Sequence, residues 1–283
     1  MIGVFDSGHG GVTVLQALHS HFPDIPFLYL GDHAHVPYGN RSSDEVVALT
    51  VQGVETLFQK GCRLVLLGCN TATAIACRHI QQEWLPHSKW QERNVLGIIA
   101  PTVEVATQTP WGLTEPQYPQ KYREDVICVF ATQRTIDSAV FDEEIKKRCP
   151  NMQVFSQSCP DLVKAIEGGA AVKEVDRLVG GYVQALNDRL EGRPPHWAVL
   201  GCTHFPLVEG LFETHLPASC RVLSQPTIVA HALEHYLQLH PHYIEGGSPA
   251  HALQLLTTGD VDQVEGRLVI NWPGRPCFER LHG

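Results

Sequence analysis

Continuously apolar runs alternate with amphipathic stretches through the first hundred residues. The runs over residues 2–5, 27–30 and 64–67 have the unbroken apolar character of parallel strands that are buried on both faces. Between them, residues 12–18 and 43–60 carry apolar side chains at the three- and four-residue spacing of a helix. This alternation predicts an α/β unit in which helices cover a parallel sheet.

The same pattern starts again after an irregular segment. Residues 109–125 contain three prolines, which indicates a domain junction or a surface insertion. A second strand-like run follows at 126–130, helices are predicted over 136–149 and 172–190, and a further apolar run occupies 197–200. We therefore predict two pseudo-symmetric α/β domains, each built on a parallel sheet.

The expected domain boundaries follow from this repeat. We assign residues 1–100 and 210–283 to a discontinuous first domain and residues 101–209 to the second. The tail is too small for a third catalytic domain. We expect it, with strand-like runs at 222–223 and 268–270, to pack back onto the first domain.

Each predicted domain carries a Gly-Cys pair at the end of a buried strand. Gly68-Cys69-Asn70-Thr71 follows the run at 64–67, and Gly201-Cys202-Thr203-His204 follows the run at 197–200. Open α/β sheets bind ligands at the carboxyl ends of their strands, so the matching positions indicate two thiols facing one site between the domains. With a thiolate on one face of a chiral carbon and a thiol on the other, the thiolate can remove the proton of the carbon. The thiol then supplies a proton to the opposite face, which inverts the configuration.

Both thiols need activation, because an ordinary cysteine is only a few per cent ionised at neutral pH. Asp6 at the end of the first strand and His204 are the natural general-base partners. The helix predicted over 72–84 begins beside Cys69, and its dipole favours a thiolate there.

The turn Asp6-Ser7-Gly8-His9-Gly10-Gly11 is rich in glycine but does not match a dinucleotide fingerprint. The third glycine of G-x-G-x-x-G is missing, and no strand-end acid follows about 20 residues later. The turn therefore favours a small polar or anionic group at a helix N-terminus rather than a nucleotide.

Composition excludes several classes of partner. The net charge of −9 without clustered lysines and arginines argues against a nucleic-acid surface. No apolar stretch reaches the ~18 residues of a membrane span, and no basic and apolar leader precedes the first strand. Nine cysteines with no Cys-x-x-Cys pair argue against a zinc ribbon or a disulfide framework, so we expect free thiols, no metal and a cytoplasmic location.

Several motifs together resemble the glutamate racemase family, a branch of the cofactor-independent aspartate/glutamate racemases. The resemblance spans nearly the whole chain. It rests on Phe5-Asp6-Ser7-Gly8-x-Gly10-Gly11, Pro37-Tyr38-Gly39, Gly68-Cys69-Asn70-Thr71-Ala72, Ala131-Thr132-x-x-Thr135, Cys159-Pro160-x-Leu162-Val163-x-x-x-Glu167, Gly201-Cys202-Thr203-His204-Phe205-Pro206 and Thr258-Gly259-Asp260.

The resemblance implies that Cys69 and Cys202 are the catalytic acid/base thiols, with Asp6 and His204 assisting on opposite sides and Glu167 supporting His204. It implies racemisation of L- and D-glutamate without pyridoxal phosphate or another cofactor, supplying D-glutamate for peptidoglycan. Enzymes of this kind are often homodimers. The residues implied to bind the amino-acid substrate are Asp6, Ser7, Pro37, Tyr38, Gly39, Asn70, Thr71, Thr132, Thr135, Thr203 and His204.

The chain departs from the family pattern at several positions. His9 stands where an aliphatic residue is common, His35 where an arginine is common, and Leu223-Ser224-Gln225-Pro226 where the family has Asp-Ser. Segments 85–94 and 109–125 look longer than usual.

Three alternatives remain open from the sequence. The first is a racemase of the same superfamily acting on aspartate or another amino acid. The second is a hydrolase using Cys202 and His204, which leaves Cys69 without a role and requires contact between side chains that are two residues apart at a strand end. The third is an amino-acid-binding protein, which does not need paired thiols.

Overall fold

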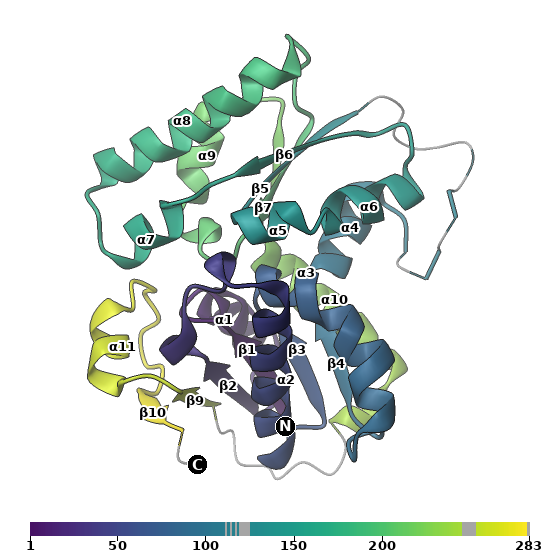
Figure 1. Cartoon of the computed structure of the whole chain (residues 1–283), viewed down its shortest axis with the longest axis vertical. Helices are drawn as coiled ribbons and strands as arrows, with labels where there is room; N and C mark the ends of the chain where they lie inside the picture. Colours follow the sequence, from purple (N-terminus) through teal and green to yellow (C-terminus); the bar gives the residue numbers. More distant parts are fainter. Residues whose placement is uncertain (111, 114, 117, 119–124, 245–252, 282–283) are drawn as a thin grey trace.

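Two parallel sheets organise the protein (Figure 1). The computed structural model describes residues 1–110, 112–113, 115–116, 118, 125–244 and 253–281. The larger sheet has the strand order β10-β9-β2-β1-β3-β4, and the smaller has the order β6-β5-β7-β8. The pairings between these strands are parallel. The strands are β1 (Ile2–Asp6), β2 (Phe27–Gly31), β3 (Leu64–Leu67), β4 (Asn94–Gly97), β5 (Val126–Ala131), β6 (Gln153–Ser158), β7 (Trp197–Gly201), β8 (Arg221–Leu223), β9 (Leu253–Thr257) and β10 (Phe278–Arg280).

Helices connect successive strands and cover both sheets. In Figure 1 the smaller sheet with α7, α8 and α9 forms the upper part, and the larger sheet with α1 and α2 forms the lower part. None of the described helices combines the length and apolar character needed to cross a lipid bilayer. The α-helices are α1 (Gly11–His21), α2 (Ser43–Gln59), α3 (Asn70–His79), α4 (Ile99–Thr107), α5 (Gln133–Asp137), α6 (Val140–Arg148), α7 (Leu162–Glu167), α8 (Val172–Leu190), α9 (Glu209–His215), α10 (Gln225–Leu239) and α11 (Val261–Arg267). Shorter helical turns are η1 (His33–His35), η2 (Tyr38–Asn40), η3 (Ile80–Trp84), η4 (Leu85–His87), η5 (Phe205–Val208) and η6 (Pro241–Tyr243).

Strand β1 is buried along its whole length because helices pack on both faces of the larger sheet. Val4 belongs to the hydrophobic cluster that includes residues of α1 and α10. Phe5, whose side chain points the other way, belongs to the cluster with α2 and α3. Helix α2 approaches β1 closely at Gly53, where a Cβ would lie 2.1 Å from the Phe5 ring. This sandwich fixes the carboxyl end of β1, where Asp6 lies.

Most elements lie close to where the apolar pattern predicts them. The predicted helix over 172–190 is α8, and the predicted strand over 197–200 is β7. The helix predicted over 136–149 is instead two helices, α5 and α6. They are separated at Ala139, which has a left-handed backbone conformation with φ of 56°.

The strand expected at residues 268–270 is wrong. Those residues have no regular secondary structure, although Ile270 packs into the cluster that contains α1 and α10. The tail instead adds β9 and β10 to the larger sheet, with β9 paired to β2. An apolar run indicates burial, and irregular backbone can be buried as well as a strand.

Strand β8, which contains the predicted run at 222–223, pairs with β7 in the smaller sheet, so the expectation that this run packs onto the first domain is wrong. The chain then returns to the larger sheet through α10. Because β8 still belongs to the smaller sheet, the boundary between the second domain and the returning part of the first lies after Leu223 rather than at residue 210. With the boundary moved to this position, the division of the chain into two domains remains our proposal. Much of segment 109–125 lies outside the described residues.

Candidate active site

Asp6 joins the two halves of the site. Its carboxylate is fully buried at the end of β1, and its Oδ1 accepts a hydrogen bond of 2.7 Å from the backbone N–H of Gly8. The Thr203 hydroxyl, next to Cys202 in the chain, donates to Asp6 Oδ2 at 3.3 Å. Burial raises the pKa of Asp6 to about 6, against the opposing effect of the His204 charge and the two hydrogen bonds. The carboxyl ends of β1 and β7 therefore meet, as the sequence predicts.

Cys69 is held at the start of α3. Its Sγ accepts from the backbone N–H of Ala72 at 3.4 Å and lies 3.5 Å from the Ser7 hydroxyl. Burial raises the pKa of the Cys69 thiol to about 12, and the Asp6 charge adds to the rise, whereas the Ser7 and Ala72 contacts oppose it. The Ala72 N–H at the start of α3 favours the thiolate, in the direction expected of a helix N-terminus, but burial and the nearby Asp6 carboxylate outweigh it. Cys69 is a neutral thiol at neutral pH.

Cys202 has a different environment. Its Sγ lies 3.8 Å from Nδ1 of His204, and Nε2 of His204 lies 2.8 Å from Oε1 of Glu167. Burial lowers the pKa of His204, but the contacts with Cys202 and Glu167 outweigh burial and raise that pKa to about 10. His204 is therefore an imidazolium at neutral pH. It donates to Glu167 through one nitrogen and faces the Cys202 sulfur with the other.

The contact between Cys202 and His204 contradicts one argument used against a hydrolase. Side chains two residues apart on an extended strand point to the same face, but they are spaced about 6.6 Å apart, too far for contact. Here the chain has already left β7 and turns, with the Phe205 N–H bonded to the Cys202 carbonyl at 3.0 Å. The turn brings the two side chains together.

Glu167, at the end of α7, contacts two imidazoles. Its Oε1 lies 2.8 Å from Nε2 of His204 and 3.4 Å from Nδ1 of His9. Burial raises the pKa of Glu167, but hydrogen bonds and charge from His204 and His9 outweigh it and hold the pKa well below its usual range. Nε2 of His9 donates to the Val264 carbonyl at 2.9 Å, which fixes the ring. His9 was not among the predicted site residues; the one sequence feature that marks it is a histidine where an aliphatic residue is common in the family.

The glycine-rich turn allows close packing between α1 and the site. A Cβ on Gly10 would lie 2.2 Å from the Thr203 hydroxyl oxygen, and one on Gly11 would lie 2.6 Å from the Cβ of Asp6. Both distances are far shorter than van der Waals contact. These glycines therefore bring α1 against the residues of both half-sites.

Tyr38 is held by a buried carboxylate. Its hydroxyl donates to Asp32 Oδ2 at 2.7 Å, and the Thr258 hydroxyl donates to Oδ1 of the same residue at 2.7 Å. Burial, the Asp32 charge and this hydrogen bond raise the pKa of Tyr38 far above its usual value. Asp32 directly follows β2 and lies at the same edge of the larger sheet as Asp6, the last residue of β1; its role was not predicted. The peptide bond between Val36 and Pro37, the residue before Tyr38, is cis.

Three threonine hydroxyls connect the two sheets. Thr71 on α3 lies 3.0 Å from the Thr132 oxygen and 3.3 Å from the Thr135 oxygen, and the latter two lie 3.1 Å apart. Thr132 caps α5 and also contacts η2, where a Cβ on Gly39 would lie 3.3 Å from it. The structure thus brings predicted binding residues from both domains into contact.

Asn70 is engaged by a residue from α10. Its amide donates to Gln225 Oε1 at 2.5 Å and accepts from Gln225 Nε2 at 3.0 Å. Gln225 is fully buried and also donates to the Thr102 hydroxyl at 3.0 Å. Gln225 lies in the segment that departs from the family pattern, and its role was not predicted. The contact orients Asn70 beside Cys69, and its predicted contact with substrate stays a prediction.

Curated relatives resemble the chain along nearly its whole length. The glutamate racemase of Phenylobacterium zucineum (strain HLK1) is 43% identical over 282 residues, covering 98% of this chain and 99% of the relative. The glutamate racemase of Caulobacter sp. (strain K31) is 44% identical over 282 residues, with the same two shares. A scan against protein-family models finds none that matches.

Solved structures share the fold. Glutamate racemase isoform RacE1 from Bacillus anthracis superposes with a TM-score of 0.80 at 24% identity, covering 100% of this chain and 97% of that one. The glutamate racemase of Francisella tularensis subsp. tularensis SCHU S4, in complex with D-glutamate, gives 0.78 at 23% identity and covers 99% and 97%. The likeness extends over both sheets.

Proposed function

The chain belongs to the glutamate racemase family, and from that premise we propose that it interconverts L- and D-glutamate by moving the α-proton between Cys69 and Cys202. The observation that carries the proposal is the hydrogen bond from Thr203 to Asp6. It joins the end of β1, beside Cys69, to the turn that holds Cys202. The reaction is an isomerisation of an amino acid.

The two thiols differ in the way that a one-proton exchange requires. In the proposed scheme Cys202, which faces the His204 imidazolium held by Glu167, begins as the thiolate, and Cys69, whose pKa is raised by burial and the Asp6 charge, begins as the thiol. In one direction Cys202 removes the α-proton and Cys69 delivers its own proton to the opposite face. The enzyme is left with a Cys69 thiolate and a Cys202 thiol, which is the starting state for the reverse direction.

Asp6 and His204 assist the thiols on opposite sides in this scheme. Asp6, with a pKa of about 6, can accept or return a proton near neutral pH when Cys69 changes its charge. His204 keeps its proton and stabilises the negative charge on Cys202. The scheme invokes no cofactor.

The small-molecule substrate is bound by hydroxyl, amide and backbone groups. Thr71, Thr132 and Thr135 offer three hydroxyls in mutual contact at the junction of the two sheets. Hydroxyls both donate and accept, so the group suits a carboxylate of glutamate. The further binding residues in the proposal are Asp6, Ser7, Pro37, Tyr38, Gly39, Asn70, Thr203 and His204.

Circular dichroism with a panel of amino-acid enantiomers tests the activity. We expect L- and D-glutamate each to approach an optically inactive mixture, and the aspartate enantiomers to lose their signal much more slowly. Racemisation of aspartate in preference to glutamate would instead support the superfamily alternative. No signal change with any acidic amino acid would contradict the proposal.

We also place the enzyme in the cytoplasm, where it supplies D-glutamate for peptidoglycan. All nine cysteines are unpaired, which suits a reducing compartment. Complementation of a bacterial strain that requires D-glutamate tests this role. The homodimer that the resemblance implies is tested by sedimentation velocity.

A further inference from the structure

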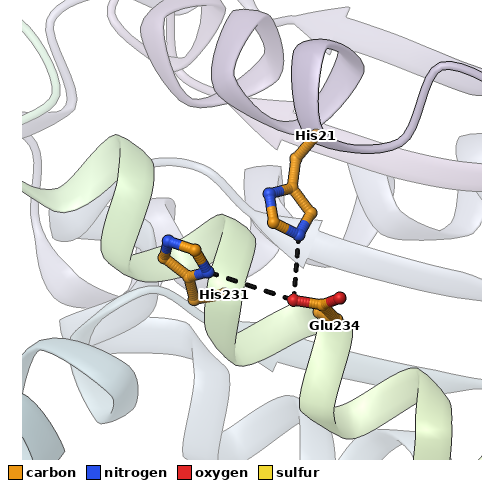
Figure 2. Close-up of side chains that lie close together, drawn as sticks. All are labelled: His21, His231 and Glu234. Atoms are coloured by element: carbon orange, nitrogen blue, oxygen red, sulfur yellow. Dashed lines mark hydrogen bonds and ion pairs between the residues drawn. The ribbon is translucent and has the colours of Figure 1, made fainter.

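A second cluster of metal-ligating side chains lies at the surface between α1 and α10 (Figure 2). His21 is the last residue of α1, and His231 and Glu234 lie one turn apart on α10. The cluster is separate from the active site, because the 11 residues of α1 place His21 about 15 Å from the turn that contacts Asp6.

We propose that His21, His231 and Glu234 form a binding site for a divalent transition-metal ion of the zinc class. Two imidazole nitrogens and one carboxylate oxygen are the protein ligands of zinc sites that keep a fourth position open for water. Imidazole also suits cobalt, nickel and copper, whereas magnesium and calcium prefer oxygen ligands alone. Nothing in the spacing of these residues along the chain predicts the site, because His21 and the other two come from distant segments.

The distances between the ligand atoms approach those around a tetrahedral ion. Nε2 of His21 lies 3.0 Å from Glu234 Oε2, and Nδ1 of His231 lies 3.9 Å from the same oxygen. All the ligand atoms lie within 4.8 Å of one another. Metal–ligand bonds of about 2.0–2.1 Å at tetrahedral angles separate ligand atoms by about 3.3 Å. The His231 side chain is 63% exposed, so it can turn toward Glu234 and shorten the 3.9 Å separation to the tetrahedral value.

The two rings are oriented toward the same point. Their centroids lie 5.0 Å apart with planes at 81°, and His21 is braced by the Phe22 ring at 4.7 Å. Figure 2 shows both imidazoles directed toward the Glu234 carboxylate from different helices. A cation between them would satisfy both nitrogen lone pairs and the carboxylate charge together.

A bound ion would tie α1 to α10. Both helices belong to the hydrophobic cluster on one face of the larger sheet. Each begins at the active site, α1 beside Asp6 and α10 at Gln225, which pairs with Asn70. The ion would therefore hold the two helices together, and occupancy is expected to raise the thermal stability of the protein.

Titration of the full chain with Zn²⁺ alone, followed by calorimetry and thermal denaturation, tests the proposal. We expect one equivalent to raise Tm in the wild type, and His21→Ala and His231→Ala each to weaken that binding at least about tenfold. His215→Ala is the matched control, since His215 also ends a helix and pairs with a carboxylate, Asp176, at 2.8 Å. The control should bind as the wild type does.

Co²⁺ distinguishes this site from the thiols. Coordination by nitrogen and oxygen gives visible d–d absorption without the sulfur-to-metal charge-transfer absorption that thiolate ligation adds. Glu234→Gln, which keeps a hydrogen-bond acceptor for His21, provides a second variant if an alanine substitution fails to fold. Unchanged binding in the histidine and Glu234 variants, thiolate charge-transfer absorption for the tight site, or no binding by the wild type would each overturn the proposal.

Discussion

Oε1 of Glu167 lies 2.8 Å from Nε2 of His204, and this contact connects α7 to the turn that carries Cys202. The half-buried Glu167 carboxylate is one of the two partners that raise the pKa of His204 to about 10. The protonation state of His204, whose Nδ1 faces Cys202 Sγ at 3.8 Å, therefore depends on a residue that follows a different strand of the smaller sheet.

Glu167→Gln removes that charge while keeping the size of the side chain. We expect kcat to fall about tenfold, which corresponds to ~1.4 kcal/mol. The alkaline limb of the pH–rate profile should move down by about one to three pH units, because His204 loses its negative partner. Glu174→Gln, a change of an exposed acid on α8, is the control and should leave both measurements unchanged.

His9→Leu installs the aliphatic residue that is common in the family. The 3.4 Å contact with Glu167 is lost, but the 2.8 Å contact with His204 remains. We expect a fall in kcat of about threefold, smaller than that of Glu167→Gln, and a partial rescue by His9→Gln. Steady-state measurement of kcat for the three variants checks the order of these effects. A fall in kcat for His9→Leu larger than that for Glu167→Gln would contradict the prediction.

Gln225→Leu leaves the Asn70 amide without its reciprocal partner. We expect a loss of about 1–3 kcal/mol in the free energy of unfolding and a rise in KM, since Asn70 is no longer oriented. A double-mutant cycle with Asn70→Ala provides the control. The combined variant should lose less than the sum of the two single changes, whereas simple additivity would show that the pair is not coupled.

The stability contribution of His204 depends on pH with a defined sign. Its pKa is raised from 6.5 to about 10, so its contribution is fully present below pH 6.5 and is lost as pH rises through 10. Glu167 has a lowered pKa, so its contribution is present above its usual value of 4.5 and is lost as pH falls through the lowered pKa.

The difference in unfolding free energy between wild type and His204→Asn should therefore be largest between pH 4.5 and 6.5. We expect about 2 kcal/mol there, because the substitution leaves the half-buried Glu167 charged without its main partner. Urea denaturation at several pH values measures the difference. A difference that grows from pH 6.5 toward pH 10 would contradict the assignment.

The sequence predicts those site residues whose positions follow from the local pattern of buried strands and the turns after them. Cys69 and Cys202 each follow a glycine at the end of a buried strand, and the carboxyl ends of parallel strands are where such folds place their ligands. Asp6 is found by the same rule. The twofold repeat of strand and cysteine indicates one shared site without any knowledge of the contacts.

The residues that support the site are not specified locally. Asn70 and Gln225 lie 155 positions apart in the chain, and Thr258 lies 226 positions from Asp32. Their partners depend on how the helices pack, which periodicity does not encode. Protonation states also depend on this packing, since burial and Asp6 together outweigh the effect of the helix N-terminus on the pKa of Cys69.

Exchange of the α-proton in heavy water tests the central claim most directly. The wild type should incorporate deuterium at the α-carbon of both L- and D-glutamate. Each single Cys→Ala variant should lose racemisation by roughly 10³-fold or more, and single Cys→Ser variants should affect the two directions unequally. Cys69→Ala combined with Cys202→Ala should abolish exchange from both enantiomers. Exchange that persists in this double variant would contradict proton transfer by the two thiols.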